Sequence, residues 1–400
     1  MLLDTERRIY LAFGLPRSVA KVWGVGSMVY YAEKMTQGIP LPKPYENIHD
    51  DAIQMGGDFI INKNGDVTFL YCSKTSSDRP LIPTLLEALK DFQEYRSLIG
   101  GYGIFLHRKK NIKFKPVHIS HRGGAGEHIE NTMTAFKHAA SIGTEMLEID
   151  CHITKDGQVV VSHDSSLKRT CETEGQVSDF KYEELPLLNE EHRLDFYQTF
   201  KLKGGEDRRI PLLREVFEAF PDMPINIDIK VDDDELIEKV NDMIKEFKRE
   251  HLIAWGNRSS KVTDKLYRIN PDIPLIFSMQ KVILLLVLFY TGLLPFVPIK
   301  ESLLEVVMPS IMFDDNKIPL KFSRTMRCLL RTADVLLMSP VLFNHLRRRG
   351  MQTYLWVLND EEEYTRAFRL GADGVMTDFP TKLKKYLDSH PEYKSQKSDV

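Results

Sequence analysis

Residues 117–390 alternate between short runs rich in β-branched residues and stretches with helical periodicity, and this alternation constrains the fold more than any other feature. A regular succession of strands and helices indicates βαβ units and a parallel sheet. Strands are expected at 117–120, 146–153, 159–162, 225–231, 253–255, 275–278, 306–312, 354–358 and 374–377, with helices at 132–141, 213–219, 234–248, 340–349 and 361–370. This pattern fits one (β/α)₈ TIM barrel better than a doubly wound sheet.

The whole chain is expected to have four parts: a front segment at 1–95, a basic linker at 96–116, the barrel at 117–390 and a polar tail at 391–400. The linker holds a one-signed cluster, namely Arg108, Lys109, Lys110, Lys113 and Lys115. This cluster is either a solvated connection or a patch that meets anionic lipid headgroups.

Composition excludes several classes of protein. The hydrophobic fraction of 42% rules out a disordered chain. A net charge of −3 gives no electrostatic case for nucleic acid, so no nucleic-acid partner is expected. The four cysteines are scattered without metal-ligand spacing, which indicates a reducing, intracellular compartment.

One uncharged apolar run, at 282–299, stands out within the barrel region. Its length is at the lower limit for a membrane span, and Pro295 and Pro298 would break the last turns of a helix. Three structures are possible: a spanning helix, an exposed loop or short helix that dips into a lipid surface, and an ordinary buried helix. With the basic linker, the run favours a membrane-associated protein, at the cytoplasmic face or the endoplasmic reticulum.

The expected strand at 146–153 carries the first candidate chemistry. Side chains alternate along a strand, so Glu148, Asp150 and His152 share one face while apolar residues fill the other. Carboxylates two positions apart are about 7 Å from each other and can converge on one hard cation. The alternative is an exposed strand face that is merely acidic.

The expected strand at 225–231 shows the same pattern of polar residues on one face. Asn226, Asp228 and Lys230 lie opposite four β-branched residues. A polar row on a buried strand is unfavourable unless it serves a site. Asp228 is therefore a candidate third metal ligand, and Lys230 a candidate cation for an anionic substrate.

Two histidines could supply acid and base. His121 is expected in the turn that ends the first strand, followed by Arg122, and His163 closes the run at 159–162. A single histidine is more often structural, but both fall at carboxyl ends of strands, where barrel enzymes keep their active sites. With Arg122, Lys230 and a metal, this set suits a phosphate diester, because cations neutralise the phosphoryl oxygens and the histidines move protons.

Six motifs between about residues 110 and 390 resemble the glycerophosphodiester phosphodiesterase family: His121-Arg122-Gly123, Glu130-Asn131-Thr132, Glu148-x-Asp150, Thr154-x-Asp156-Gly157, His163-Asp164, and Gly374-Val375-Met376-Thr377-Asp378-x-Pro380. The segments at 210–213 and 291–298 are similar to the vertebrate branch of that family that acts as a lysophospholipase D.

The resemblance implies a TIM barrel, a magnesium or calcium ion, and two catalytic histidines, His121 and His163, with Arg122 on the phosphate. It further implies metal binding by Glu148 and Asp150. His163 can also touch the metal, and Asp228 stands where family members often carry Glu. Glu130 and Asn131 are expected to orient the first loop, although Asn131 also suits a helix N-cap.

The front segment has a different character. The runs at 59–61 and 67–71 flank Asn64-Gly65 and predict a β-hairpin, and a helix with leucines on one face is expected after Pro80. This part resembles the C-terminal half of peroxiredoxin-like, thioredoxin-fold proteins of the AhpC/TSA group. Because no Cys-x-x-Cys occurs and Cys72 has no resolving partner nearby, no redox activity is expected.

The function expected from these features is a metal-dependent phosphodiesterase. It would hydrolyse lysophospholipids, giving lysophosphatidic acid and the free headgroup, or glycerophosphodiesters, at a membrane surface. The alternative is a catalytically inactive fusion or binding module with a thioredoxin-like front. The truncated front segment favours this alternative, and the undamaged barrel motifs argue against it.

Overall fold

The computed structural model describes residues 57–61, 67–72, 110–205, 207–294, 297–314, 317–318 and 322–394. The chain divides into two compact units, one formed by 1–108 with 287–298 and the other by 109–286 with 299–400. The second unit contains the strands and helices that position the candidate site.

The hairpin expected in the front segment is confirmed. Strand β1 (Gly57–Ile61) pairs antiparallel with β2 (Val67–Cys72), with an irregular register at Ile60 and Ile61. The helix expected after Pro80 and the rest of the segment that was expected to be thioredoxin-like lie outside the described residues.

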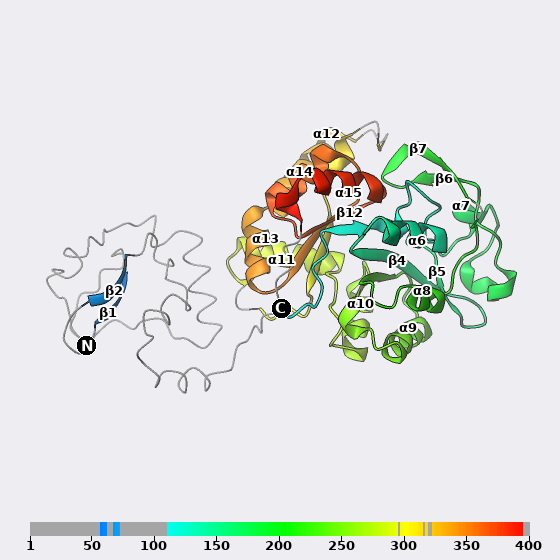
Figure 1. The fold of residues 1–400 in the computed structure, drawn as a ribbon, viewed down its shortest axis with the longest axis horizontal. Coiled ribbons are helices and arrows are strands. Elements are labelled where there is room, and N and C mark those ends of the chain that lie inside the picture. Colours follow the sequence, from blue (N-terminus) through cyan, green and yellow to red (C-terminus); the bar gives the residue numbers. More distant parts are fainter. Residues whose placement is uncertain are drawn as a thin grey trace. The chain divides into compact units, whose positions relative to one another are not determined.

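Seven parallel strands form the barrel within the described ranges, in the order β10-β11-β12-β3-β4-β8-β9. They are β3 (His118–Ser120), β4 (Met146–Ile153), β8 (Ile225–Ile229), β9 (Ile253–Gly256), β10 (Leu303–Val307), β11 (Gln352–Trp356) and β12 (Gly374–Thr377). Parallel bridges from Trp255 to Leu275 and from Ile276 to Leu303 join β9 to β10. The barrel therefore closes at the place where an eighth strand was expected, and helices surround it (Figure 1).

Three expected strands differ from the structure. The run at 159–162 forms β5 (Val159–Val161), which pairs antiparallel with β4 and is no barrel strand. The segment at 275–278 makes bridges only. The strand expected at 306–312 lies earlier in the chain, as β10. It ends before Pro309, because Pro309 has no N–H to donate and instead begins the 3₁₀ helix η7 (Pro309–Phe313).

The helices expected from periodicity at 132–141, 213–219, 234–248, 340–349 and 361–370 are all present. The described helices are α6 (Met133–Ser141), α7 (Lys168–Cys171), α8 (Leu213–Ala219), α9 (Asp234–Glu246), α10 (Ser260–Ile269), α11 (Met279–Tyr290), α12 (Arg324–Leu337), α13 (Pro340–Arg348), α14 (Glu361–Leu370) and α15 (Pro380–Ser389). The sequence did not predict α7, α10, α12, α15 or the hairpin of β6 (Glu191–Leu194) and β7 (Tyr197–Lys203).

The hydrophobic core lies between the outer face of the sheet and these helices. Leu147, Ile149 and Cys151 of β4 are completely buried there, and they pack in one cluster with residues of α8 and α9. Burying each such side chain contributes roughly 1.5–3 kcal/mol. The polar residues of β4 therefore face the barrel interior, as the alternation predicted.

Part of the expected linker belongs to the barrel unit. Phe114 is buried in a core cluster, and its carbonyl accepts a hydrogen bond from Nε2 of Gln352 at 2.7 Å. The backbone N–H of Lys110 donates to the carbonyl of Arg349. Residues 110–116 thus belong to the barrel unit, in which Phe114 and Pro116 are buried while Lys113 and Lys115 remain exposed.

Helix α11 contains the start of the apolar run. In the described ranges, no helix has the length and apolar character needed to cross a membrane. Val282 and Leu285 of α11 are buried, whereas Ile283 is 57% exposed, Leu284 43% and Val287 54%. Among the three possibilities for this run, an exposed apolar helix matches α11.

Candidate active site

A strained turn at the end of β3 presents the first two candidate residues. His121–Gly123 form a 3₁₀ turn in which Arg122 has a φ of 50°, in the left-handed region. The backbone N–H of Arg122 donates to Oε2 of Glu148 at 2.8 Å. Gly123 also has a positive φ, and a Cβ there would lie 2.7 Å from the ring of Phe136. Only glycine fits this position, because both conformation and space exclude a side chain.

His121 is oriented by a buried carboxylate. Its Nδ1 lies 2.7 Å from Oδ1 of Asp378, which directly follows β12. Asn359 holds this carboxylate in turn, since its Nδ2 donates to Asp378 Oδ2 at 3.0 Å. A carboxylate only accepts hydrogen bonds, so Nδ1 of His121 carries the proton and Nε2 is left for a substrate.

His163 has the same kind of partner. Its Nδ1 lies 2.5 Å from Oδ1 of Asp164, and Arg169 Nε donates to the other oxygen of Asp164 at 2.5 Å. Burial would raise the pKa of Asp164, but His163 and Arg169 outweigh burial and lower it. The two candidate histidines thus share one arrangement, an imidazole whose tautomer is fixed by a carboxylate.

Asp150 is the centre of the charged group inside the barrel. Its Oδ1 lies 2.7 Å from Nζ of Lys230, and its Oδ2 accepts from Nδ2 of Asn131 at 2.8 Å and lies 3.4 Å from Nε of Arg122. Burial disfavours the charged carboxylate, yet Lys230 and Arg122 outweigh burial and lower the pKa of Asp150. Asp150 is therefore an anion held between two cations.

Glu148, Asp150 and Asp228 together form a row of acidic side chains inside the barrel, called here the acidic row. Paired strands β4 and β8 place Asp150 beside Asp228, whose Oδ2 lies 2.6 Å from Nζ of Lys230. Burial and the neighbouring Asp150 raise the pKa of Glu148 well above its usual value. Oδ1 of Asp228 is buried without a hydrogen-bond partner. The row thus places three carboxyl groups beside two cations, and Glu148 is the one whose protonated form is favoured.

Arg122 is buried among carboxylates, and its guanidinium does not lie free to meet a phosphate. Its NH1 lies 3.1 Å from Glu130 and its NH2 lies 2.9 Å from Asp195. Burial would raise the pKa of Glu130, but Arg122 and Arg169 lower it to about 2. Asp195, whose side chain is 37% exposed, is the most accessible of these partners.

Glu130 and Asn131 both contact the site, and one of two expectations for Asn131 is wrong. The N-cap of α6 is Thr132, whose side chain accepts from the N–H of Ala135. Asn131 instead adopts a left-handed φ of 57°, and its backbone N–H donates to the carbonyl of Arg122. It thereby joins the first loop to Asp150.

Sequence reasoning missed three acids near this site: Asp195, Glu305 and Asp378. Glu305 of β10 accepts hydrogen bonds on both oxygens from Nδ2 of Asn226, at 2.7 and 2.8 Å. Burial raises its pKa to about 8 despite these bonds. A single acid in the apolar strand Leu303–Val307 was a usable signal, but the strand was expected to begin at residue 306, one position after Glu305.

The donor set suits a hard divalent cation. Glu148, Asp150 and Asp228 offer the carboxylate oxygens that magnesium and calcium prefer, and the unpartnered Oδ1 of Asp228 is one such donor. As they stand, no three His, Cys, Asp or Glu side chains of the described residues are grouped closely enough to hold a metal. His163 is instead bonded to Asp164.

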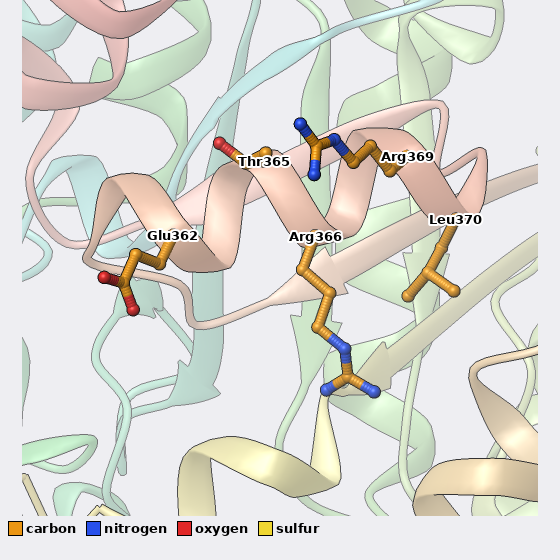
Figure 2. Close-up of a pocket in the computed structure, with 5 residues that line it drawn as sticks. All are labelled: Glu362, Thr365, Arg366, Arg369 and Leu370. Atoms are coloured by element: carbon orange, nitrogen blue, oxygen red, sulfur yellow. The ribbon is translucent and has the colours of Figure 1, made fainter.

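A surface depression elsewhere contains none of these residues. It has a volume of about 430 Å³ and is lined by Glu362, Thr365, Arg366, Arg369 and Leu370. Figure 2 shows all five on one helix, α14. Arg366 is paired with Asp334 of α12, so the depression has a structural ion pair at its side.

Comparisons with known proteins show which family the chain resembles. A family model described as "Glycerophosphoryl diester phosphodiesterase family" matches residues 121–382. The rat protein named Lysophospholipase D GDPD1 is 55% identical over 305 residues, covering 76% of this chain and 96% of its own. Human Lysophospholipase D GDPD3 is 35% identical over 285 residues, covering 71% and 89%. A glycerophosphodiester phosphodiesterase structure from Thermotoga maritima has a TM-score of 0.47 at 23% identity, covering 67% and 97%.

Proposed function

Because this chain belongs to the glycerophosphoryl diester phosphodiesterase family and is a phosphodiester hydrolase, we propose that it cleaves lysophospholipids between phosphate and headgroup. The products would be lysophosphatidic acid and the free alcohol. Glycerophosphodiesters are substrates of the same chemistry. The observation that carries the proposal is the pair of carboxylate-bound imidazoles, His121–Asp378 and His163–Asp164, at a buried row of acids and cations.

The two histidines supply proton transfer. Each presents Nε2 to the substrate, since Nδ1 is bonded to a carboxylate. One removes a proton from the nucleophile, which is water or the glycerol hydroxyl of the substrate, and the other protonates the leaving alcohol. Asp378 and Asp164 stabilise the imidazolium form of whichever histidine has gained the proton.

Arg122 and Lys230 supply positive charge for the phosphoryl oxygens. Both are already surrounded by carboxylates, which keeps them protonated and fixed in place. Asp195 lies at the exposed side of Arg122 and would leave when a phosphate binds. Charge-assisted contacts of arginine with phosphate are strong and directional, which suits this exchange.

A magnesium or calcium ion is part of the proposal. Glu148, Asp150 and Asp228 would hold it, with Glu305 as a further acidic neighbour, and His163 remains a candidate ligand. The cation would neutralise charge on the phosphate and favour the ionised form of Glu148, whose pKa burial and the neighbouring Asp150 raise.

We extend the proposal to an attachment at the membrane surface. Ile283, Leu284 and Val287 expose an apolar face on α11, and no charged residue occurs in 282–299. Exposed apolar side chains on a helix favour the boundary between lipid headgroups and acyl chains. Such an attachment would bring the enzyme to substrates that reside in lipid.

Choline release tests the proposal. Purified protein is given lysophosphatidylcholine and glycerophosphocholine, each with magnesium, with calcium and with an excess of chelator. Wild-type protein is expected to release choline in a reaction that stops with chelator and resumes with added metal. The His163→Ala and Glu148→Gln variants are expected to lose release, while Glu392→Gln, a surface change, keeps it.

Absence of choline from both substrates would contradict the proposed activity. Release that survives both the chelator and His163→Ala would leave the activity but contradict the site. Circular dichroism and thermal unfolding of each variant separate loss of activity from loss of fold.

A further inference from the structure

An aromatic group lies at the carboxyl ends of the barrel strands, and the chemistry described above does not use it. Three members, Phe196, Tyr197 and Phe200, belong to the β6–β7 hairpin. The other two are Trp356, the last residue of β11, and Phe379, which follows Asp378 after β12. All five are only partly buried, so the group keeps apolar surface open to solvent.

The rings form two contacting sets, and each set joins the hairpin to the end of a barrel strand. The ring centroids of Phe196 and Trp356 are 5.5 Å apart at an interplanar angle of 82°. Phe200 and Phe379 are 5.2 Å apart at 83°, and Tyr197 lies 6.3 Å from Phe379. These edge-to-face contacts join the hairpin to the ends of β11 and β12.

The aromatic group adjoins the candidate active site through the chain itself. Phe196 directly follows Asp195, whose carboxylate lies 2.9 Å from NH2 of Arg122. Phe379 directly follows Asp378, whose carboxylate holds His121. One aromatic residue therefore follows each of two carboxylates that bind the proposed catalytic side chains.

We infer that this aromatic group binds the acyl chain of a lysophospholipid whose phosphate contacts Arg122. The inference rests on the proposed function and assigns its substrate class, since only a lipid diester has an apolar tail to place there. Aromatic rings supply large apolar area at small loss of conformational freedom, which suits a flexible acyl chain. Glycerophosphocholine, which lacks that chain, would reach Arg122 and the histidines without using the group.

A purely structural role for the rings makes a different prediction. If they only fix the hairpin, their removal would disturb Asp195 and Arg122 and would affect every substrate alike. If they bind the acyl chain, the loss is confined to the lipid substrate. Comparing two substrates that differ only in the chain separates these roles.

The experiment measures kcat/KM for choline release from monomeric lysophosphatidylcholine and from glycerophosphocholine. The variants are Phe196→Ala, Phe200→Ala and the double variant. The matched control is Tyr393→Ala, which removes a partly exposed ring from the stack on Phe368. The double variant is expected to lose about tenfold or more on the lipid, given the apolar area of two rings, and less than twofold on glycerophosphocholine. The dependence of KM on acyl length should flatten.

An equal loss on both substrates, or no loss on either, would overturn the inference while the phosphodiesterase activity stands. A binding measurement tests the acyl-chain site independently of turnover. In the His163→Ala variant, lysophosphatidylcholine with a brominated acyl chain should quench the fluorescence of Trp356, with Trp356→Phe as the reference for the other tryptophans. Quenching without hydrolysis by wild type would contradict the proposed function alone, and absence of quenching would overturn the acyl-chain site.

Discussion

Nδ1 of His121 lies 2.7 Å from Oδ1 of Asp378, although 257 positions separate the two residues in the chain. The contact follows from closure of the barrel, because β12 pairs with β3 and places Thr377 beside Ser120. His121 directly follows β3, and Asp378 directly follows β12. The last strand of the barrel thus supplies the partner that the first strand's histidine needs.

Replacing Asp378 by Asn is expected to reduce kcat by about 10²–10⁴-fold, the range that proton transfer contributes. An amide in this position would allow the wrong tautomer of His121, as it keeps size but changes hydrogen bonding. The measurement is the pH profile of kcat for choline release. Asp388→Asn, an exposed acid on α15, is the control and should leave the profile unchanged. A variant with the wild-type profile would show that Asp378 does not orient His121.

Glu130 should contribute to stability in a pH-dependent way. Its folded pKa of about 2 lies below its ordinary value of 4.5 because Arg122 and Arg169 outweigh burial. The stabilisation is fully present above pH 4.5 and is lost as the pH falls through about 2. It amounts to about 3 kcal/mol at neutral pH. Glu130→Gln is expected to lower the free energy of unfolding in urea at pH 7 and to flatten its fall below pH 4.5, whereas an unchanged slope would contradict the account.

Asp195 should compete with substrate for Arg122. Its side chain is 37% exposed, so the ion pair contributes at most about 1 kcal/mol. Asp195→Asn is therefore expected to lower KM for glycerophosphocholine by up to about fivefold with little change in kcat. Glu191→Gln, on the same hairpin, is the matched control. A rise in KM would mean instead that Asp195 holds Arg122 in its productive position.

The exposed face of α11 should govern attachment to lipid. The double variant Ile283→Ser with Leu284→Ser is expected to pellet with liposomes several-fold less than wild type, because it removes two exposed apolar side chains. Leu187 and Val341 are exposed to 57% and 68% elsewhere, so their joint change to Ser is the control. Undiminished pelleting of the α11 variant would exclude this face as the anchor.

The inward-facing polar residues of the site could be predicted, because side chains alternate between the two faces of a strand. Alternation alone places Glu148 and Asp150 on the inner face of β4, and it places Asn226 and Asp228 the same way on β8, with Lys230 directly after that strand. The order of strands and helices likewise predicted the barrel. These features depend on local periodicity, which a single sequence carries.

The carboxylates that bind His121 and Arg122 could not be predicted, because these contacts form between distant segments of the chain. Asp378 meets His121 only through barrel closure, and Asp195 meets Arg122 from a hairpin that the sequence did not predict and whose strand β7 has no buried residue. Glu305 was missed through a strand boundary, although Pro309 marked where that strand must end. From the sequence, Asn131 could either orient the first loop or cap the following helix. Its left-handed φ is consistent with the loop position and excludes the cap.

The most direct test of the central claim identifies the products formed from lysophosphatidylcholine in ¹⁸O-labelled water by mass spectrometry. The account predicts free choline together with lysophosphatidic acid, labelled on phosphate when water is the nucleophile, or its cyclic phosphate when the glycerol hydroxyl attacks. Formation of phosphocholine and monoacylglycerol would contradict it, because the cleaved bond would then lie on the other side of the phosphorus.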